Sequence, residues 1–140
     1  MKNLIYMNCG SENELLPSKF AASADRLRTD CGFYDHVGTA DGNGMIYAKS
    51  RKYGCLRLVT PYQFSEGRPI HNEGQVGIYP SWYVLKRLHS KLGEPYDFLN
   101  GNCEHANNEA HGLGRVSPQI NNLFFKLFVV AVVITVARAA

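Results

Sequence analysis

The sequence predicts an α+β fold in which helices follow and pack on an antiparallel sheet. Two observations support this prediction. Short segments separated by turn residues occupy residues 26–60, and a segment with helical periodicity occupies residues 80–93. A further helix is expected to begin at Asn102, because asparagine is a favourable N-cap. With 140 residues, of which 45% are hydrophobic and 19% charged, the chain suits one compact domain.

The predicted sheet is built around a hairpin. Residues 41–44, Asp-Gly-Asn-Gly, contain two of the dipeptides that most strongly favour a tight turn between antiparallel strands. The second predicted strand carries His36. The strands are expected over residues 26–29, 33–40, 45–48 and 53–60.

A loop and a helix are predicted to follow the sheet. Residues 65–80 are rich in Gly and Pro and carry His71, which favours a loop. Pro80 suits the first turn of an amphipathic helix, and Gly93 suits its end. The face expected to pack on the domain comprises Trp82, Leu85, His89 and Leu92.

Residues 100–108, Asn-Gly-Asn-Cys-Glu-His-Ala-Asn-Asn, place Cys103 in the first turn of the next predicted helix. The positive end of a helix favours the thiolate and lowers the pKa of the thiol. The unpaired N–H groups there can also hold an oxyanion. Taken alone, the same pattern also fits a small, buried and unreactive cysteine.

The chain resembles the lecithin:retinol acyltransferase (LRAT) family at three places. Residues 96–105 contain an Asn-Cys-Glu-His box, and residues 112–120 are similar to the segment that follows this box in the family. Residues 34–44 resemble the family's His box, a Tyr-X-His-hydrophobic-Gly run that ends in a glycine-rich hairpin. The resemblance implies a papain-like fold in circularly permuted order, with the His strand first and the Cys helix last.

The resemblance also implies roles for individual residues. Cys103 would be the nucleophile and His36 the general base. Family members carry a second His on the returning strand of the hairpin. An ungapped count from His36 places Ala48 at this position, and a turn that is one residue shorter places Tyr47 there. Tyr47 is therefore a candidate for the third residue of the site. The residues expected to support the site from just outside it are Tyr34, Asn102, Glu104 and His105. Replacement of the second His by His71, His89 or His111 stays open.

These residues predict a cysteine-dependent acyltransferase or hydrolase. It would act on a lipid ester, a thioester or an amide through an acyl-thioester intermediate on Cys103. Two other functions fit the same pattern. One is a catalytically silent LRAT-like protein that binds a host or partner protein at a membrane, and the other is a cysteine peptidase or amidase.

Neither a cofactor nor a metal is expected. Cys103, His105 and His111 do not have the spacing of a zinc site. The basic cluster Lys49, Arg51 and Lys52 lacks interleaved aromatic residues, so nucleic acid is not an expected partner. The expected partners are a lipid or acyl substrate and a membrane surface.

The sequence divides into three predicted parts. Residues 1–24 form a segment of unassigned role with a short strand near its start, residues 25–122 form the LRAT-like domain, and residues 123–140 are hydrophobic. Lys126 interrupts the last part, so it spans a bilayer only marginally, with its basic residues reaching the interface. A packed or self-associating segment is the alternative. Because no signal peptide and no C-x-x-C pair is present, we expect a cytoplasmic protein that associates with membranes through this segment.

Overall fold

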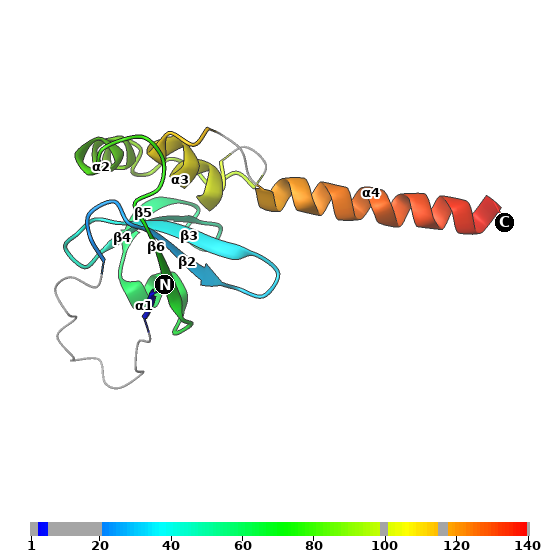
Figure 1. Ribbon diagram of the computed structural model, residues 1–140, viewed down its shortest axis with the longest axis horizontal. Helices are drawn as coiled ribbons and strands as arrows, with labels where there is room; N and C mark the ends of the chain where they lie inside the picture. Colours follow the sequence, from blue (N-terminus) through cyan, green and yellow to red (C-terminus); the bar gives the residue numbers. More distant parts are fainter. Residues whose placement is uncertain (1–2, 6–20, 99–100, 115–117, 140) are drawn as a thin grey trace.

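The computed structural model describes residues 3–5, 21–98, 101–114 and 118–139, and it has an α+β architecture (Figure 1). Within these residues one six-stranded sheet has the strand order β1-β6-β2-β3-β4-β5, and every neighbouring pair is antiparallel. The strands are β1 (Asn3–Ile5), β2 (Arg26–Asp30), β3 (Asp35–Ala40), β4 (Ile46–Ser50), β5 (Cys55–Val59) and β6 (Ile70–Gly74). The helices are α1 (Pro61–Ser65), α2 (Ser81–Ser90), α3 (Cys103–His111) and α4 (Pro118–Ala139). The α+β prediction is confirmed.

The central hairpin forms as predicted. The Asp41 carboxylate accepts hydrogen bonds from the backbone N–H groups of Asn43 and Met45, at 2.7 and 2.9 Å, and this closes the turn between β3 and β4. The paired residues in this hairpin run from Gly38 opposite Ala48 to the turn. The first residues of β3 pair with β2 but have no partner on β4 among the described residues, so the two strands part at this end of the sheet.

The predicted loop over residues 65–80 is wrong, because it contains β6, which lies second from the edge of the sheet between β1 and β2. Ile70 is fully buried and anchors this strand. The strand was missed because its other residues, from His71 to Gly74, are polar or small and show no apolar alternation. The first predicted part of the chain also contributes to the sheet, since β1 pairs with β6.

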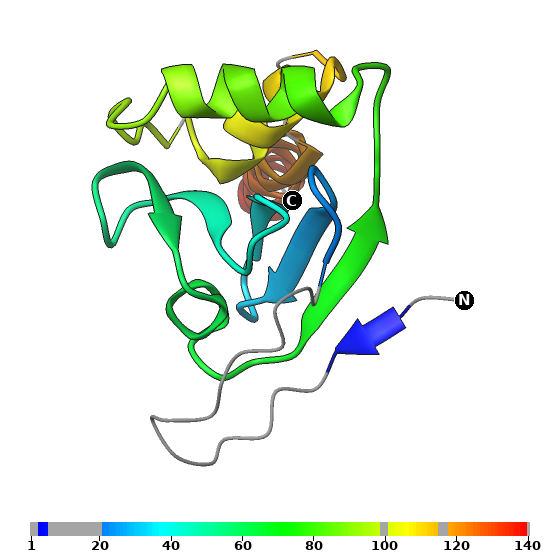
Figure 2. The same cartoon turned by 90° about the vertical axis from the view of Figure 1, so that its left-hand side faces the viewer.

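The two faces of the sheet are covered by different helices, as Figure 2 shows with α2 and α3 across one face and α1 beneath the other. Side chains of successive strand residues alternate between these faces. One core cluster lies on the α1 side and contains Leu27, Ala40, Ile46, Ala48, Val59, Phe64 and Ile70. A second cluster lies on the side of α2 and α3 and contains Tyr47, Leu56, Val84, Leu88 and Ala110.

The predicted packing face of α2 is confirmed at Leu85, which is partly buried and packs against the second core cluster, and is wrong at Trp82 and Leu92. Val84 and Leu88 are buried, whereas Trp82 is 67% exposed. These two buried residues are four apart and face the second core cluster, which sets the rotation of the helix. Leu92 lies beyond the last residue of α2 and is also exposed. Contacts with the second core cluster, which the sequence of α2 alone does not contain, therefore decide which apolar side of this helix is buried.

Helix α4 extends away from the rest of the structure in Figure 1, toward the same side as the turn between β2 and β3. The predicted boundary at residue 123 falls inside this helix. Its exposed apolar side chains include Phe124, Phe125, Leu127, Phe128, Val130 and Val133. Within the part of the chain that the structure describes, no helix has the length and apolarity required to cross a bilayer.

Candidate functional site

Cys103 is the first residue of α3, as predicted. The side-chain oxygen of Asn102 accepts a hydrogen bond from the backbone N–H of His105 at 3.0 Å, so Asn102 is the N-cap. The amide nitrogen of Asn102 donates to the backbone oxygen of Phe98 at 3.2 Å, which joins the cap to the preceding segment. The thiol-bearing residue is 7% exposed. The predicted cap is confirmed, and it joins the start of α3 to the segment before it.

The thiol of Cys103 lies beside β3, at the end where β3 and β4 part. Its Sγ atom lies 3.9 Å from the backbone oxygen of Asp35, and it accepts a backbone hydrogen bond from Val37. Asn107, one turn along α3, donates to the backbone oxygens of both Val37 and Cys103, at 3.3 and 2.9 Å. The helix is therefore fastened to the unpaired edge of β3 by its thiol and by a fully buried amide.

His36 lies on β3 between these two contacts, but its side chain points to the opposite face of the sheet. Its ring stacks on Phe64 of α1 with the ring centroids 4.7 Å apart. Burial lowers the pKa of His36 to about 4, and the negative charge of Glu66 acts in the other direction. The imidazole is therefore neutral at physiological pH.

Cys103 and His36 meet at one cavity of about 440 Å³ at the end of the sheet. The thiol enters it from the α3 side and the imidazole from the α1 side. Within the described residues the two side chains share the cavity without a hydrogen bond between them. The other residues that line it are Cys31, Phe33, Tyr34, Lys49, Ser50, Arg51, Lys52, Phe64, Glu66, Arg68, Tyr96 and Phe98.

The expected low pKa of Cys103 is wrong. Burial raises the pKa of its thiol to about 11 and outweighs the hydrogen bond from the Val37 backbone, which favours the thiolate. The neighbouring carboxylate of Glu104 acts in the same direction as burial. The resting pair is therefore a thiol and a neutral imidazole.

Of the residues expected around the site, Tyr34 lines the cavity. Its hydroxyl is hydrogen-bonded to Cys31, and burial is the main cause that raises the pKa of Tyr34. Glu104 lies 3.9 Å from the guanidinium of Arg26 on β2, which adds a link between α3 and the sheet. His105 is buried in α3 and does not line the cavity.

The structure does not bring Tyr47 to the cavity. It pairs with Thr39 on the α2 and α3 side of the sheet, and its hydroxyl lies 3.3 Å from Nδ1 of His89. Ala48 shares the face of His36 but is fully buried in the core. The prediction for Tyr47 fails because consecutive strand residues point to opposite faces.

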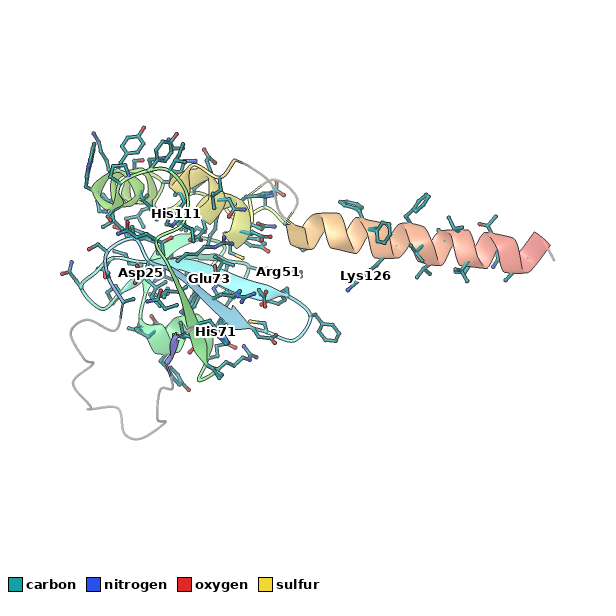
Figure 3. The ribbon with its side chains drawn as sticks, in the orientation of Figure 1. Asp25, Arg51, His71, Glu73, His111 and Lys126 are labelled. Carbon is teal, nitrogen blue, oxygen red and sulfur yellow. The ribbon has the colours of Figure 1, made fainter. Side chains whose placement is uncertain are left out.

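The three other histidines considered as replacements also lie away from the cavity lining. His89 is the partner of Tyr47 on α2. His71 is on β6, and the Nε2 atom of His111 lies 3.1 Å from the hydroxyl of Thr39 (Figure 3). None of these three histidines therefore shares the cavity with Cys103 and His36.

Glu66 is the acidic residue that the sequence did not single out. It follows α1 in a left-handed conformation with φ 53°, and its carboxylate lies 2.7 Å from Nζ of Lys52 and 3.7 Å from the guanidinium of Arg68. The capping box formed by Thr60 and Gln63 could have predicted α1, but nothing local in the sequence indicates that Glu66 faces His36.

No group of three or more His, Cys, Asp or Glu side chains within the described residues can hold a metal ion. In comparisons with known proteins, no family model and no curated protein matches the chain. The chemistry of the site therefore follows from the residues of the cavity.

Proposed function

We propose that the protein is a cysteine-dependent acyltransferase or hydrolase of the LRAT-like, permuted papain-like kind. The observation that carries this proposal is that Cys103, at the start of α3, and His36, on β3, line one cavity. A thiol at a helix N-terminus and an imidazole in one cavity are the two groups that acyl transfer through a thioester requires. The resemblance of the two sequence boxes supports the same chemistry.

The reaction would begin from the neutral pair. As Sγ of Cys103 attacks the carbonyl carbon, His36 takes the thiol proton, so the imidazole acts as a general base. Backbone N–H groups in the first turn of α3 stabilise the oxyanion. Collapse forms the thioester on Cys103 and expels the leaving group, which receives the proton from His36. An alcohol, an amine or water then attacks the thioester, with its proton passing to His36. The C–S bond breaks, the acyl product leaves, and the Cys103 thiolate takes the proton back from His36, which restores the neutral pair.

The lining of the cavity favours an acyl compound over a peptide. Five aromatic residues line the cavity, and most of its surface is apolar, although charged side chains also line it: the aromatic residues are Phe33, Tyr34, Phe64, Tyr96 and Phe98. A pocket surface that is mainly apolar is typical of sites for hydrophobic ligands. We therefore favour a lipid ester or thioester over a peptidase substrate. We also propose that the protein is cytoplasmic and associates with membranes through α4.

A second candidate is a catalytically silent protein with the same fold. The specific observation in its favour is the pair of pKa values, because a thiol with a pKa of about 11 and an imidazole with a pKa of about 4 disfavour proton transfer in the free protein. Substrate binding would have to reverse these shifts for the reaction to proceed.

Intact-mass spectrometry of the full chain separates the two candidates. We would expose the wild type, Cys103→Ala and His36→Gln to ester, thioester and amide donors. We expect an acyl adduct on the wild type, slower adduct formation in His36→Gln and none at this position in Cys103→Ala. Cys55→Ala is the matched control, because Cys55 lies outside the cavity lining. Absence of an adduct with every donor would favour the silent binding protein.

A further inference from the structure

Exposed aromatic side chains are among the residues that line the proposed active-site cavity, and we take them to mark its opening. Phe33, at the tip of the turn between β2 and β3, is 105% exposed. Tyr34 and Phe98, which line the same cavity, are 57% and 53% exposed. Exposed apolar patches of this kind are typical of interaction surfaces. We call these three residues the aromatic rim.

The turn that carries Phe33 is held in place by hydrogen bonds. The backbone N–H of Gly32 donates to the carboxylate of Asp30 at 2.6 Å, and the N–H of Cys31 donates to the backbone oxygen of Tyr34 at 2.9 Å. Gly32 has φ +86°, a conformation that glycine adopts without strain. The exposure of Phe33 is therefore set by the conformation of the turn.

Basic side chains lie around the same opening. Arg51, Lys52 and Arg68 are exposed and line the cavity. Among the described lining residues Glu66 is the one carboxylate, and it is paired with Lys52 and Arg68. The opening therefore has an excess of positive charge, to which Arg51 contributes.

We propose that this opening docks on an anionic lipid bilayer. The aromatic rim would enter the interfacial zone, where aromatic side chains are favourable, and Arg51, Lys52 and Arg68 would face the headgroups. Charge complementarity and the protruding tip favour a bilayer as the partner. Figure 1 shows α4 extending from the side of the domain that carries this turn, and Figure 3 shows Arg51 toward the same side. Docking goes beyond the proposed chemistry and does not require it.

A fluorescence experiment on the full chain tests the depth of the turn in the bilayer. The protein has one tryptophan, Trp82, which lies on α2 outside the cavity lining. We would combine Phe33→Trp with Trp82→Phe and add vesicles of phosphatidylcholine, with and without phosphatidylserine, whose acyl chains are brominated. We expect the new indole at position 33 to be quenched and its emission to shift to shorter wavelength on the phosphatidylserine vesicles. The indole of Trp82 in the wild type is the matched control and should stay unquenched.

A charge variant tests the second part of the proposal. Arg51→Gln should weaken binding to phosphatidylserine vesicles by about five-fold, the effect of one basic side chain at an anionic surface. Lys86→Gln, at an exposed position on α2, is the matched control and should leave binding unchanged.

Three outcomes would overturn the proposal: no binding to either vesicle, binding without quenching at position 33, or equal binding to both vesicles with no effect of Arg51→Gln. The second outcome would assign binding to another surface, such as α4, and leave the aromatic rim for a protein partner. The same measurements on Cys103→Ala separate docking from chemistry. Docking with no acyl adduct in the wild type would contradict the proposed reaction alone.

Discussion

The Sγ atom of Cys103 lies 3.9 Å from the backbone oxygen of Asp35, at the end of β3 that precedes the pairing of this strand with β4. This contact places the thiol against β3, and Cys103 is 7% exposed. The positive end of α3 favours the thiolate, but removal of the thiol from water has the larger effect. The strand that buries the thiol also carries His36, so one element positions both groups.

The first prediction concerns the reactivity of Cys103 in the free protein. We expect iodoacetamide to modify Cys103 more slowly than Cys31 near neutral pH, because the thiolate is the reactive form and Cys103 is buried with a pKa of about 11. The Cys103 rate should rise steeply with pH toward that value. Peptide mass spectrometry after timed alkylation measures each rate. If Cys103 is modified fastest near neutral pH, then its thiolate forms readily and burial does not determine the pKa of its thiol.

Several features of the fold could be predicted from local sequence. The hairpin at Asp41 and the cap at Asn102 each depend on side chains that bond to backbone a few residues away. The meeting of Cys103 and His36 in one cavity was expected from the resemblance of the two boxes. Strand β6 was missed because it is stabilised by its neighbours in the sheet rather than by its own pattern.

The remaining features of the site depend on contacts between distant segments. Glu66 and Phe64 approach His36 only because α1 packs beneath β3, and the sequence carries no local sign of this packing. The burial of Cys103 depends on where β3 and β4 part. Tyr47 was chosen from a count along the chain, and the pairing of Tyr47 with Thr39 places it on the other face.

The second prediction is that His36 makes the fold sensitive to mild acid. Its pKa falls from 6.5 to about 4 on folding, so the unfolded chain binds a proton more readily between these values. Stability should be fully present above pH 6.5 and should decline as the pH falls toward 4, with about 3 kcal/mol lost from this group. Urea unfolding of the wild type and His36→Gln across this range measures the loss.

His36→Gln should flatten the acid dependence, because glutamine does not titrate. His71→Gln on β6 is the matched control and should keep the dependence of the wild type. An unchanged dependence in His36→Gln would assign the sensitivity to other groups and contradict the lowered pKa.

The third prediction concerns Gly38, where the absence of a side chain makes room for Phe64, the residue that stacks on His36. A Cβ atom at this position would lie 2.6 Å from Ile46 Cγ2 and 2.9 Å from Phe64 Cε2. Gly38→Ala should therefore displace Phe64, destabilise the fold by about 1–3 kcal/mol and slow adduct formation, because Phe64 stacks on His36. Thermal unfolding and the adduct rate are the two measurements. Adding Phe64→Leu to Gly38→Ala should recover part of the stability but not the rate of adduct formation. If Gly38→Ala alone changes neither quantity, then Gly38 does not pack closely against Phe64.

The last prediction identifies the third residue of the site. Glu66 favours the charged form of His36, while Tyr47 lies across the sheet and contacts His89 instead. In Glu66→Gln the pKa of His36 should fall further, and the weaker base should slow adduct formation a few-fold. Tyr47→Phe should leave both quantities unchanged. Nuclear magnetic resonance titration of the His36 ring reports the pKa, and intact-mass spectrometry reports the rate.

Lys52→Gln is expected to shift the pKa of His36 in the opposite direction from Glu66→Gln. It removes the positive charge 2.7 Å from the Glu66 carboxylate, so the negative charge acts on His36 with less compensation. The pKa of His36 should then rise. Because these two variants change neighbouring charges in opposite senses, a general disturbance of the fold would not produce opposite shifts. If both variants move the pKa in the same direction, or if Tyr47→Phe alone slows the reaction, then Glu66 is not the group that supports the imidazole.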